Sequence, residues 1–424
     1  MGRRLPGSPL ESLHRAASRG IPGEHPIVRL HLPGYSILNG RYGRPGPHGE
    51  GLLDSRRRTW PAGDQGGQEG EEVRAAVWHG ARDVRLDEVA EPAPLAKGRA
   101  LVEVSLAGIC ASDVAEYRDG PHVIPVARPH ALTGRCAPIV LGHEYVGHVA
   151  AVGADVGGLT VGTRVCGDAC IRCGSCYWCL RGEYNICELG GSVGLHADGA
   201  FARFVDVPAY TLFALPNEVS DRCATAVEPL AVGLHALRQA GLRPGENVVV
   251  IGYGMIGAGV AALAKSIGAG RVFVVEPNRH RARLAESMGI SEVLCNPDLD
   301  LRREVRARTR VGADVVVECS GVPRLLGEAI EATRRGGRVV LCGIGHQEGT
   351  IRPSRIVYFE RTIVGALGYR FDHGAVIDLL ADGRLDMSPV FGEEIALSDI
   401  VGGGFERALR ESSCPLRVPV VLHA

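Results

Sequence analysis

Four apolar segments in the second half of the chain constrain the fold more than any other feature. These segments are ENVVVIG, RVFVVEP, DVVVECSG and GGRVVLCGI, and helix-like stretches such as MIGAGVAALAKSIGA separate them. Strands of a parallel sheet are apolar throughout because helices cover both faces of the sheet. The sequence therefore predicts an α/β fold with a parallel sheet wrapped by helices.

A glycine-rich loop directly follows the first apolar segment. Gly252, Gly254 and Gly257 have the G-x-G-x-x-G spacing, after a strand and at the start of a helix. The first glycine permits a tight turn, the second lets the backbone approach a pyrophosphate, and the third lets helix and strand pack closely. The helix N-terminus attracts the anion. The loop predicts a dinucleotide site, and a glycine-rich turn of another α/β protein is the alternative.

Glu276 ends the second apolar segment, near the position about 20 residues after the loop where such folds carry an acidic residue. Its carboxylate would accept hydrogen bonds from the ribose hydroxyls and repel a 2′-phosphate, so we expect NAD rather than NADP. Arg279, Arg281 and Arg283 follow it. These arginines either relax the preference for NAD or form a solvated helix face.

The rest of the chain has a different character. After residue 72, short β-rich runs alternate with Gly and Pro turns, which predicts an irregular β-barrel-like domain. Beyond residue 370 strand-like and helix-like segments no longer alternate, and the C-terminal tail is expected to return to the β-rich domain. The predicted domains are 73–228 with 370–424, and 229–369 for the dinucleotide. Residues 1–72 are rich in Gly, Pro and charge and are predicted to be a disordered arm.

Composition argues against several kinds of partner. A net charge of −1 creates no field that would favour nucleic acid or an anionic membrane, and no apolar run is long enough to cross a bilayer. We therefore expect a small-molecule partner. The 13 cysteines occur without an apolar segment at the N-terminus, so they are expected in a reducing compartment, the cytoplasm.

Four of the cysteines crowd into one loop. Cys173, Cys176, Cys179 and Cys187 have the spacing C-x2-C-x2-C-x7-C. Four thiolates can surround Zn²⁺ as a tetrahedron with no open position, which is typical of a structural site. A surface thiol cluster and an iron–sulfur site are alternatives. A zinc ribbon for nucleic acid is a further one, and the absence of a basic stripe beside the loop argues against it.

Three separate segments carry residues that suit a second zinc site. Cys110 lies in GICASD, His143 and Glu144 lie in LGHEYVGHV, and Glu228 lies in VEPLAVGLHA. A lone cysteine or histidine is more often a packing residue. Together, however, Cys110, His143 and Glu228 offer a thiolate, an imidazole and a carboxylate. Three protein ligands leave one position free, as in catalytic zinc sites.

These motifs resemble the zinc-dependent medium-chain dehydrogenase/reductase family, in which they occur in the same order across residues 73–424. The segments EYRDGP, PHALTGRCAPIVLGHE and GALGYRFDHGAVIDLLADGRLD are most similar to its 2,3-butanediol dehydrogenase branch, with sorbitol and threonine dehydrogenases as neighbours. The resemblance implies a GroES-like catalytic domain interrupted by a Rossmann domain. It also implies a homodimer or homotetramer.

The resemblance also implies roles for individual residues. Cys110, His143 and Glu228 would hold the catalytic zinc, and Glu144 would approach the metal when water or substrate leaves. Ser112 would take the proton of the alcohol. The implied reaction transfers hydride between NAD and a secondary alcohol, either a vicinal diol, an acyloin or a polyol, with a ketone on the other side. An amino-alcohol or cyclitol dehydrogenase and a non-catalytic zinc-binding protein are the alternatives.

One position departs from the family pattern. Many relatives have a histidine five residues after the zinc-binding cysteine, where it passes protons to solvent, and this chain has Ala115 there. We therefore expect the proton to travel through water or the cofactor ribose instead.

Overall fold

The computed structural model describes residues 72–92, 95–345, 347–410 and 413–422. The predicted disordered arm, residues 1–72, lies outside the described residues except for Glu72, which is the first residue of the first strand. None of the helices formed by the described residues is both long and apolar enough to cross a membrane.

The N-terminal part of the described chain consists mainly of antiparallel strands. One sheet has the order β2-β1-β4, with bounds β1 Glu72–Gly80, β2 Asp83–Ala90 and β4 Ile139–Val140. A larger sheet contains β3 Arg99–Gly108, β5 Glu144–Val152, β6 Arg164–Gly167, β9 Phe204–Pro208, β10 Leu212–Ala214, β17 Ile395–Ala396 and β18 Pro419–Val421. Buried aromatic residues, including Trp78, Tyr145 and Phe201, fill a core that both sheets share.

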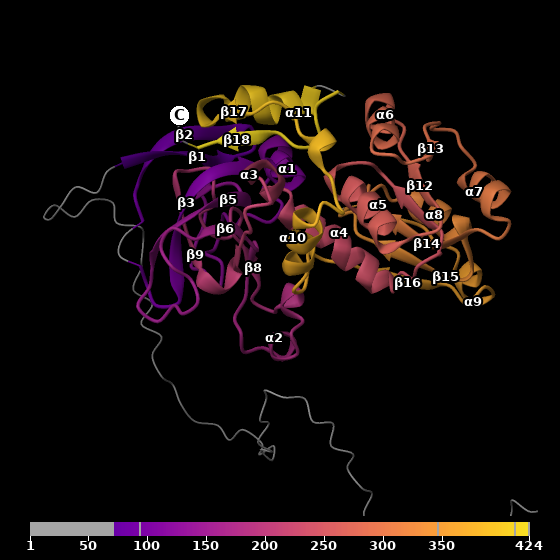
Figure 1. The fold of residues 1–424 in the computed structure, drawn as a ribbon, viewed down its shortest axis with the longest axis horizontal. Coiled ribbons are helices and arrows are strands. Elements are labelled where there is room, and N and C mark those ends of the chain that lie inside the picture. The colour runs from indigo at the N-terminus through magenta and orange to yellow at the C-terminus, as the bar shows by residue number, and fades with distance from the viewer. Residues whose placement is uncertain (1–71, 93–94, 346, 411–412, 423–424) are drawn as a thin grey trace, which may run out of the picture. The chain divides into compact units, whose positions relative to one another are not determined.

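The C-terminal tail completes this β-rich domain. Strand β18 pairs antiparallel with β3, so Pro419 lies opposite Gly108. Figure 1 shows the yellow C-terminal strands beside the indigo N-terminal ones. The intervening parallel sheet therefore interrupts the β-rich domain in sequence.

The four apolar segments form the centre of a parallel sheet, as predicted. Its order is β13-β12-β11-β14-β15-β16, with bounds β11 Val248–Ile251, β12 Val272–Val275, β13 Glu292–Leu294, β14 Ala313–Glu318, β15 Thr333–Leu341 and β16 Thr362–Gly365. All four residues of β11 are buried. The strand order changes direction between β11 and β14, and in open α/β sheets ligands bind outside the carboxyl ends of the strands at such a point. The predicted α/β class is confirmed.

Helices accompany both parts of the chain. The bounds are α1 Ala111–Asp119, α2 Tyr177–Leu180, α3 Asp221–Ala224, α4 Val227–Ala240, α5 Met255–Ile267, α6 Arg279–Ser287, α7 Leu301–Thr309, α8 Leu325–Ala332, α9 Pro353–Val357, α10 His373–Ala381 and α11 Arg407–Arg410.

Helix α4 connects the two domains. It contacts α5 and β15 of the parallel-sheet domain and β5 of the β-rich domain. Pro229 lies in its first turn, where a missing amide proton costs nothing, and the left-handed Gly241 ends it. Glu228 therefore lies at the end of α4 that is nearest in sequence to the β-rich domain.

Candidate metal and cofactor sites

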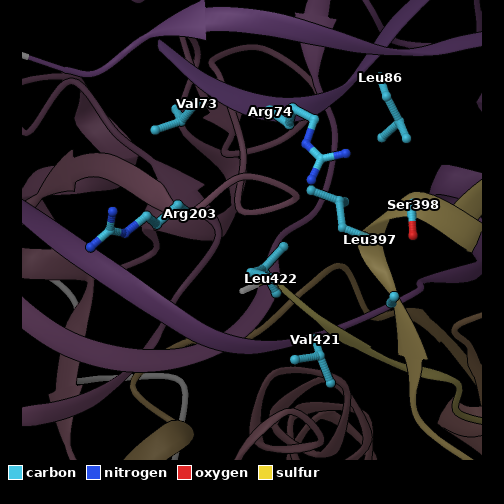
Figure 2. A pocket seen from close by; sticks show the side chains of 9 residues that line it. Val73, Arg74, Leu86, Arg203, Leu397, Ser398, Val421 and Leu422 are labelled. Carbon is cyan, nitrogen blue, oxygen red and sulfur yellow. The ribbon is translucent and has the colours of Figure 1, made fainter. Parts of the chain in front are cut away.

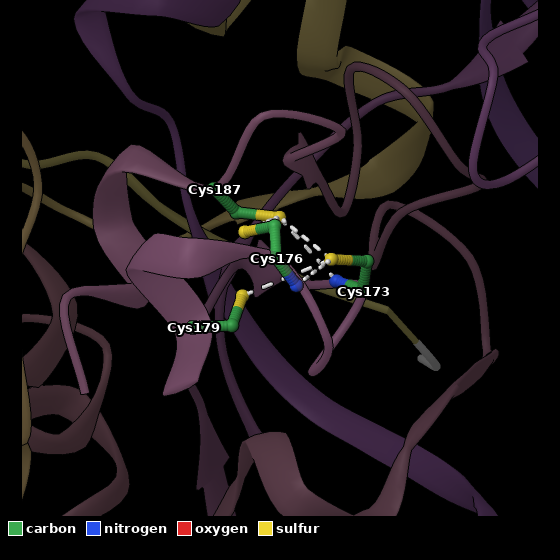
Figure 3. Close-up of side chains that lie close together, drawn as sticks. All are labelled: Cys173, Cys176, Cys179 and Cys187. Carbon is green, nitrogen blue, oxygen red and sulfur yellow. Dashed lines mark hydrogen bonds between the residues drawn. The ribbon is translucent and has the colours of Figure 1, made fainter. Parts of the chain in front are cut away.

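The loop between β7 (Cys170–Ile171) and β8 (Gly191–Ser192) brings the four predicted cysteines together (Figure 3). The Sγ–Sγ distance is 3.5 Å for Cys173 and Cys187, 3.9 Å for Cys176 and Cys187, and 4.0 Å for Cys173 and Cys179. A tetrahedral zinc with Zn–S bonds of about 2.3 Å would separate its sulfur ligands by about 3.8 Å. These three distances are close to that value, and all four sulfur atoms lie within 4.8 Å of one another, so their spacing suits zinc.

Backbone amides prepare this cluster for a cation. The amide of Cys173 donates to Cys187 Sγ at 3.4 Å, and the amide of Cys176 donates to Cys173 Sγ at 3.3 Å. Backbone hydrogen bonds from Ser175 and Cys176 lower the pKa of Cys173 to about 6, whereas burial and the nearby sulfurs raise the pKa of Cys179 to about 12. A divalent cation would allow all four thiols to ionise together, so the donor set fits zinc. No disulfide occurs among the cysteines in the described part of the chain.

A second group of possible ligands forms in the β-rich domain. The ligand atoms of Cys110, His143 and Glu144 all lie within 4.8 Å of one another. Cys110 immediately precedes α1, whereas His143 and Glu144 occupy the turn into β5. That turn needs glycine at position 142, because its φ is 95° and a Cβ there would lie 2.8 Å from the Phe201 ring.

Neighbouring polar groups orient the second group. The amide of Cys110 donates to Asp113 Oδ2 at 3.0 Å, and Asp113 Oδ1 lies 3.6 Å from His143 Nδ1. Asp113 and His143 are both buried, and these two facing atoms have no hydrogen-bond partner among the described residues. A carboxylate beside Nδ1 favours the tautomer that leaves Nε2 free for a cation. Ser112 Oγ lies 3.4 Å from that Nε2.

Arg417 is a site residue that the sequence analysis missed. Only 1% exposed, it forms an ion pair with Glu144 and donates from Nη1 to the carbonyl of Ile109 at 3.1 Å. Burial lowers the pKa of Arg417 to about 10, and the charges of Cys110 and Asp113 oppose this shift. No sequence motif predicts Arg417 as a site residue, because it lies far from the other site residues in sequence. The pairing of β18 with β3 brings it close to them.

Glu228 is not part of this second group: its carboxylate is not among the ligand atoms that lie within 4.8 Å of one another. It still interacts electrostatically with the site: burial, Asp113 and Glu228 together raise the pKa of Cys110 to about 11. Burial raises the pKa of Glu228 itself to about 6, and His143 opposes the shift. The structure thus groups Glu144, rather than Glu228, with Cys110 and His143. Glu144 follows His143 in one turn, whereas Glu228 comes from a separate helix.

Three buried polar residues, Tyr369, Asp168 and Tyr184, lie near Glu228 or the four-cysteine loop. The Tyr369 hydroxyl accepts from the amide of Ala169 at 2.8 Å, and it opposes the rise that burial causes in the pKa values of Glu228 and Asp168. Tyr184 donates from its hydroxyl to Asp168 Oδ2 at 3.0 Å. Tyr184 lies in the sequence between the last two cysteines of the loop. Asp168 is therefore hydrogen-bonded to a residue of the four-cysteine loop and also acts on the pKa of Glu228.

The glycine loop has the features that a pyrophosphate site needs. Gly252 has a φ of 90°, which favours glycine, and a Cβ at Gly257 would lie 2.0 Å from the carbonyl oxygen of Gly252. A Cβ at Gly254 would meet nothing within 4 Å. Gly254 immediately precedes α5, so this open space lies where the helix N-terminus would attract phosphate.

Glu276 supports this loop directly. Its carboxylate accepts hydrogen bonds from the amides of Tyr253, at 2.8 Å, and Asn278, at 2.9 Å, and the residue is buried. Each carboxylate oxygen has a second lone pair, so the group retains capacity to accept ribose hydroxyls. Glu276 thus lies beside the loop, as the spacing predicted.

A separate pocket lies on the β-rich domain, with Arg74, Leu86, Arg203 and Leu422 among the residues that line it (Figure 2). None of the predicted site residues lines this pocket, and we assign no function to it.

Comparisons with known proteins identify the family. One protein-family model, an alcohol dehydrogenase GroES-like domain, matches residues 96–217, and another, a zinc-binding dehydrogenase, matches residues 256–382. The chain is 36% identical over 342 residues to (R,R)-butanediol dehydrogenase of Bacillus subtilis, covering 80% of this chain and 97% of that protein. The chain belongs to the zinc-dependent medium-chain dehydrogenase family. The predicted GroES-like domain interrupted by a Rossmann domain is thereby confirmed.

Other relatives of this dehydrogenase agree with that assignment. The crystal structure of 2R,3R-butanediol dehydrogenase from Bacillus subtilis has a TM-score of 0.78 at 35% identity, covering 82% of this chain and 99% of that one. L-threonine 3-dehydrogenase of Idiomarina loihiensis is 32% identical over 311 residues, covering 72% of this chain and 87% of that protein. These comparisons support an alcohol dehydrogenase with zinc and a nicotinamide cofactor. The cytoplasmic location, the domain boundaries and the homo-oligomer stay predictions.

Proposed function

We propose that this dehydrogenase transfers hydride between NAD and a secondary alcohol, and that the alcohol is a vicinal diol, an acyloin or a polyol. The observation that carries the proposal is the convergence of the Cys110, His143 and Glu144 ligand atoms in a chain that also has a dinucleotide loop. The similarity to butanediol dehydrogenase supports the class of substrate.

Cys110 and His143 would hold the catalytic zinc, and the geometry favours Glu144 as the third protein group. Zinc, when bound, would act as a Lewis acid that lowers the pKa of a hydroxyl beside it. Asp113 orients His143, and Arg417 balances the charge of Glu144. The predicted role of Glu228 as a ligand stays a proposal. The nearby Tyr369 hydroxyl favours its ionised form, which a metal ligand requires.

Ser112 is the proposed first acceptor of the alcohol proton, since its hydroxyl lies beside the Nε2 of His143. Ala115 lies on the same helix and has no group that can carry the proton onward. We expect the pH–rate profile of the wild-type enzyme to lack an ionisation near the ordinary histidine pKa of about 6.5. Ala115→His should add an ionisation of this kind to the pH–rate profile. Such an ionisation already present in the wild type, and removed by substituting a histidine, would contradict this route.

The preference for NAD is proposed to depend on Glu276. Glu276→Gln should lower kcat/KM for NAD by about 10- to 100-fold, the effect of losing a hydrogen bond to a charged group. The value for NADP should fall much less, because a negative charge that repels the 2′-phosphate is removed. The rates at which NADH and NADPH form measure the two kcat/KM values. Glu286→Gln, at an exposed position of α6, is the matched control. Equal losses for the two cofactors would contradict the role of Glu276.

The hydroxyl of Tyr369 is expected to support both the fold and the site. Tyr369→Phe leaves the amide of Ala169 without its acceptor and removes a hydroxyl that favours the ionised form of Glu228. An unsatisfied buried group costs about 1–3 kcal/mol of unfolding free energy, which chemical denaturation can measure. Tyr358→Phe, at a tyrosine that is 78% exposed, should leave stability unchanged. Equal stability of the two variants would mean that the buried hydroxyl of Tyr369 contributes nothing to stability.

A substrate panel tests the proposed reaction. Diols, polyols, threonine and cyclitols are offered with NAD, and NADH formation is followed. Turnover of 2,3-butanediol is the expected result. Activity with an amino alcohol or cyclitol, while butanediol and acetoin are inert, would favour the alternative substrate class. A zinc-loaded protein without any turnover would indicate the non-catalytic alternative.

A further inference from the structure

Two cysteines outside the metal clusters lie side by side at the carboxyl end of the parallel sheet. Cys319 directly follows β14 and Cys342 directly follows β15. In the register of these parallel strands Glu318 lies opposite Leu341, so the two cysteines are the next pair. Neighbouring strands are about 4.8 Å apart. Disulfides span Cα–Cα distances of about 4.4–6.8 Å. The backbone therefore holds these residues at a distance that a disulfide can bridge.

The two side chains also lie on the same face of the sheet, because Cys319 and Cys342 are the next paired positions of neighbouring parallel strands. Both residues are only partly buried. The interaction of the two thiols lowers the pKa of Cys342 and raises the pKa of Cys319 well above its ordinary value. One thiol is thus favoured as the attacking thiolate while its neighbour stays protonated. An oxidant in solution can reach a partly exposed thiol.

This thiol pair lies against the cofactor loop. Ser320 follows Cys319, and its Cβ would lie 3.1 Å from a Cβ built at Gly252. The backbones after β14 and β15 also pack tightly, because a Cβ at Gly343 would lie 2.2 Å from the amide nitrogen of Gly321. A covalent bond between Cys319 and Cys342 would therefore constrain backbone that adjoins Gly252.

We propose that Cys319 and Cys342 are an oxidisable dithiol, and that their disulfide form binds the nicotinamide cofactor more weakly. The first part stands on the geometry of the pair alone, and the second part rests on the proposed function. With hydrogen peroxide as oxidant, one thiolate attacks the O–O bond and becomes a sulfenic acid. The second thiol displaces the sulfenic oxygen as water. Two thiols and one peroxide therefore give one disulfide and two waters, and a dithiol reductant reverses the change.

Peptide mapping tests the bond. The full-length protein is treated with hydrogen peroxide, its remaining thiols are blocked, and it is digested with trypsin. Cys319 lies in the tryptic peptide 311–324 and Cys342 in the peptide 339–355. We expect these peptides joined, with a mass two hydrogens below their sum, and separated by dithiothreitol. Cys319→Ser and Cys342→Ser should each abolish the product, and Cys295→Ser, in the same domain, should not. The proposal would be overturned if the joined peptides are not found, or if Cys319 and Cys342 pair preferentially with other cysteines.

Cofactor binding tests the second part. NADH fluorescence should report an affinity about tenfold weaker for the oxidised protein, restored by dithiothreitol and unchanged in oxidised Cys342→Ser. By reciprocity, bound NADH should slow the cross-link. Zinc is measured in the same samples, to separate this effect from oxidation of the four-cysteine loop. A cross-link that leaves NADH affinity unchanged would overturn the coupling. A reduced protein that does not bind NADH would instead overturn the proposed function, and the cross-link would remain.

Discussion

Replacing Cys110 by alanine is expected to remove the catalytic zinc and nearly all hydride transfer. The thiolate is one of the three candidate ligands that converge there among the residues that the structure describes, so the remaining imidazole and carboxylate would hold the metal weakly. Metal analysis should find about one zinc per chain instead of two, the one in the four-cysteine loop. Loss of a Lewis acid worth several kcal/mol should lower kcat/KM by roughly a thousandfold or more.

Companion variants show whether that result comes from the site. Cys136→Ser changes a cysteine outside both clusters and should retain two zinc ions and full activity. Glu144→Gln and Glu228→Gln, measured in parallel, identify the carboxylate that completes the site. The geometry favours a greater loss of zinc from Glu144→Gln. Two zinc ions and normal turnover in Cys110→Ala would remove the basis of the proposed mechanism.

Replacing Cys173 by serine is expected to have the largest effect on stability. Cys173 Sγ accepts the amide of Cys176 and lies near two other sulfurs, so three thiols would remain for a metal that needs four ligands. The loss of a structural metal belongs to the few changes that cost more than about 4 kcal/mol of unfolding free energy. Thermal or chemical unfolding measures this loss, together with zinc content.

The same change should also reduce activity, although Cys173 is far in sequence from the second ligand group. Tyr184 lies within the four-cysteine loop and donates to Asp168, which, like Tyr369, acts on the pKa of Glu228. If the loop loses its metal, this support for Glu228 is lost. Cys295→Ser is the control for a thiol outside the loop. An unchanged zinc content and unfolding midpoint in Cys173→Ser would contradict a structural zinc. Visible absorbance of the purified wild-type protein would favour iron–sulfur instead.

Local spacing explains which parts of the fold and site were predictable. Gly252, Gly254 and Gly257 act within one turn, and the four cysteines act within one loop, so their distances along the chain nearly fix their distances in space. The continuous apolar character of the β11, β12 and β14 segments likewise reflects burial on both faces, which needs no knowledge of the partner strands. For these features, the spacing of residues in the sequence is enough to predict their arrangement in space.

The grouping of Cys110 with His143 and Glu144 is different, since only the packing of the loop before α1 against the turn into β5 brings these residues within ligand distance. Arg417, Tyr369 and the contact of Cys319 with Cys342 show the same limit. Each depends on the register or packing of segments far apart in the chain. The sequence by itself determined the fold class, the dinucleotide loop and the four-cysteine loop, because local spacing and burial set them. Only the tertiary structure decided which groups lie around the thiolate and imidazole, Glu144 and Arg417 among them, because long-range contacts follow from strand pairing and not from residue type.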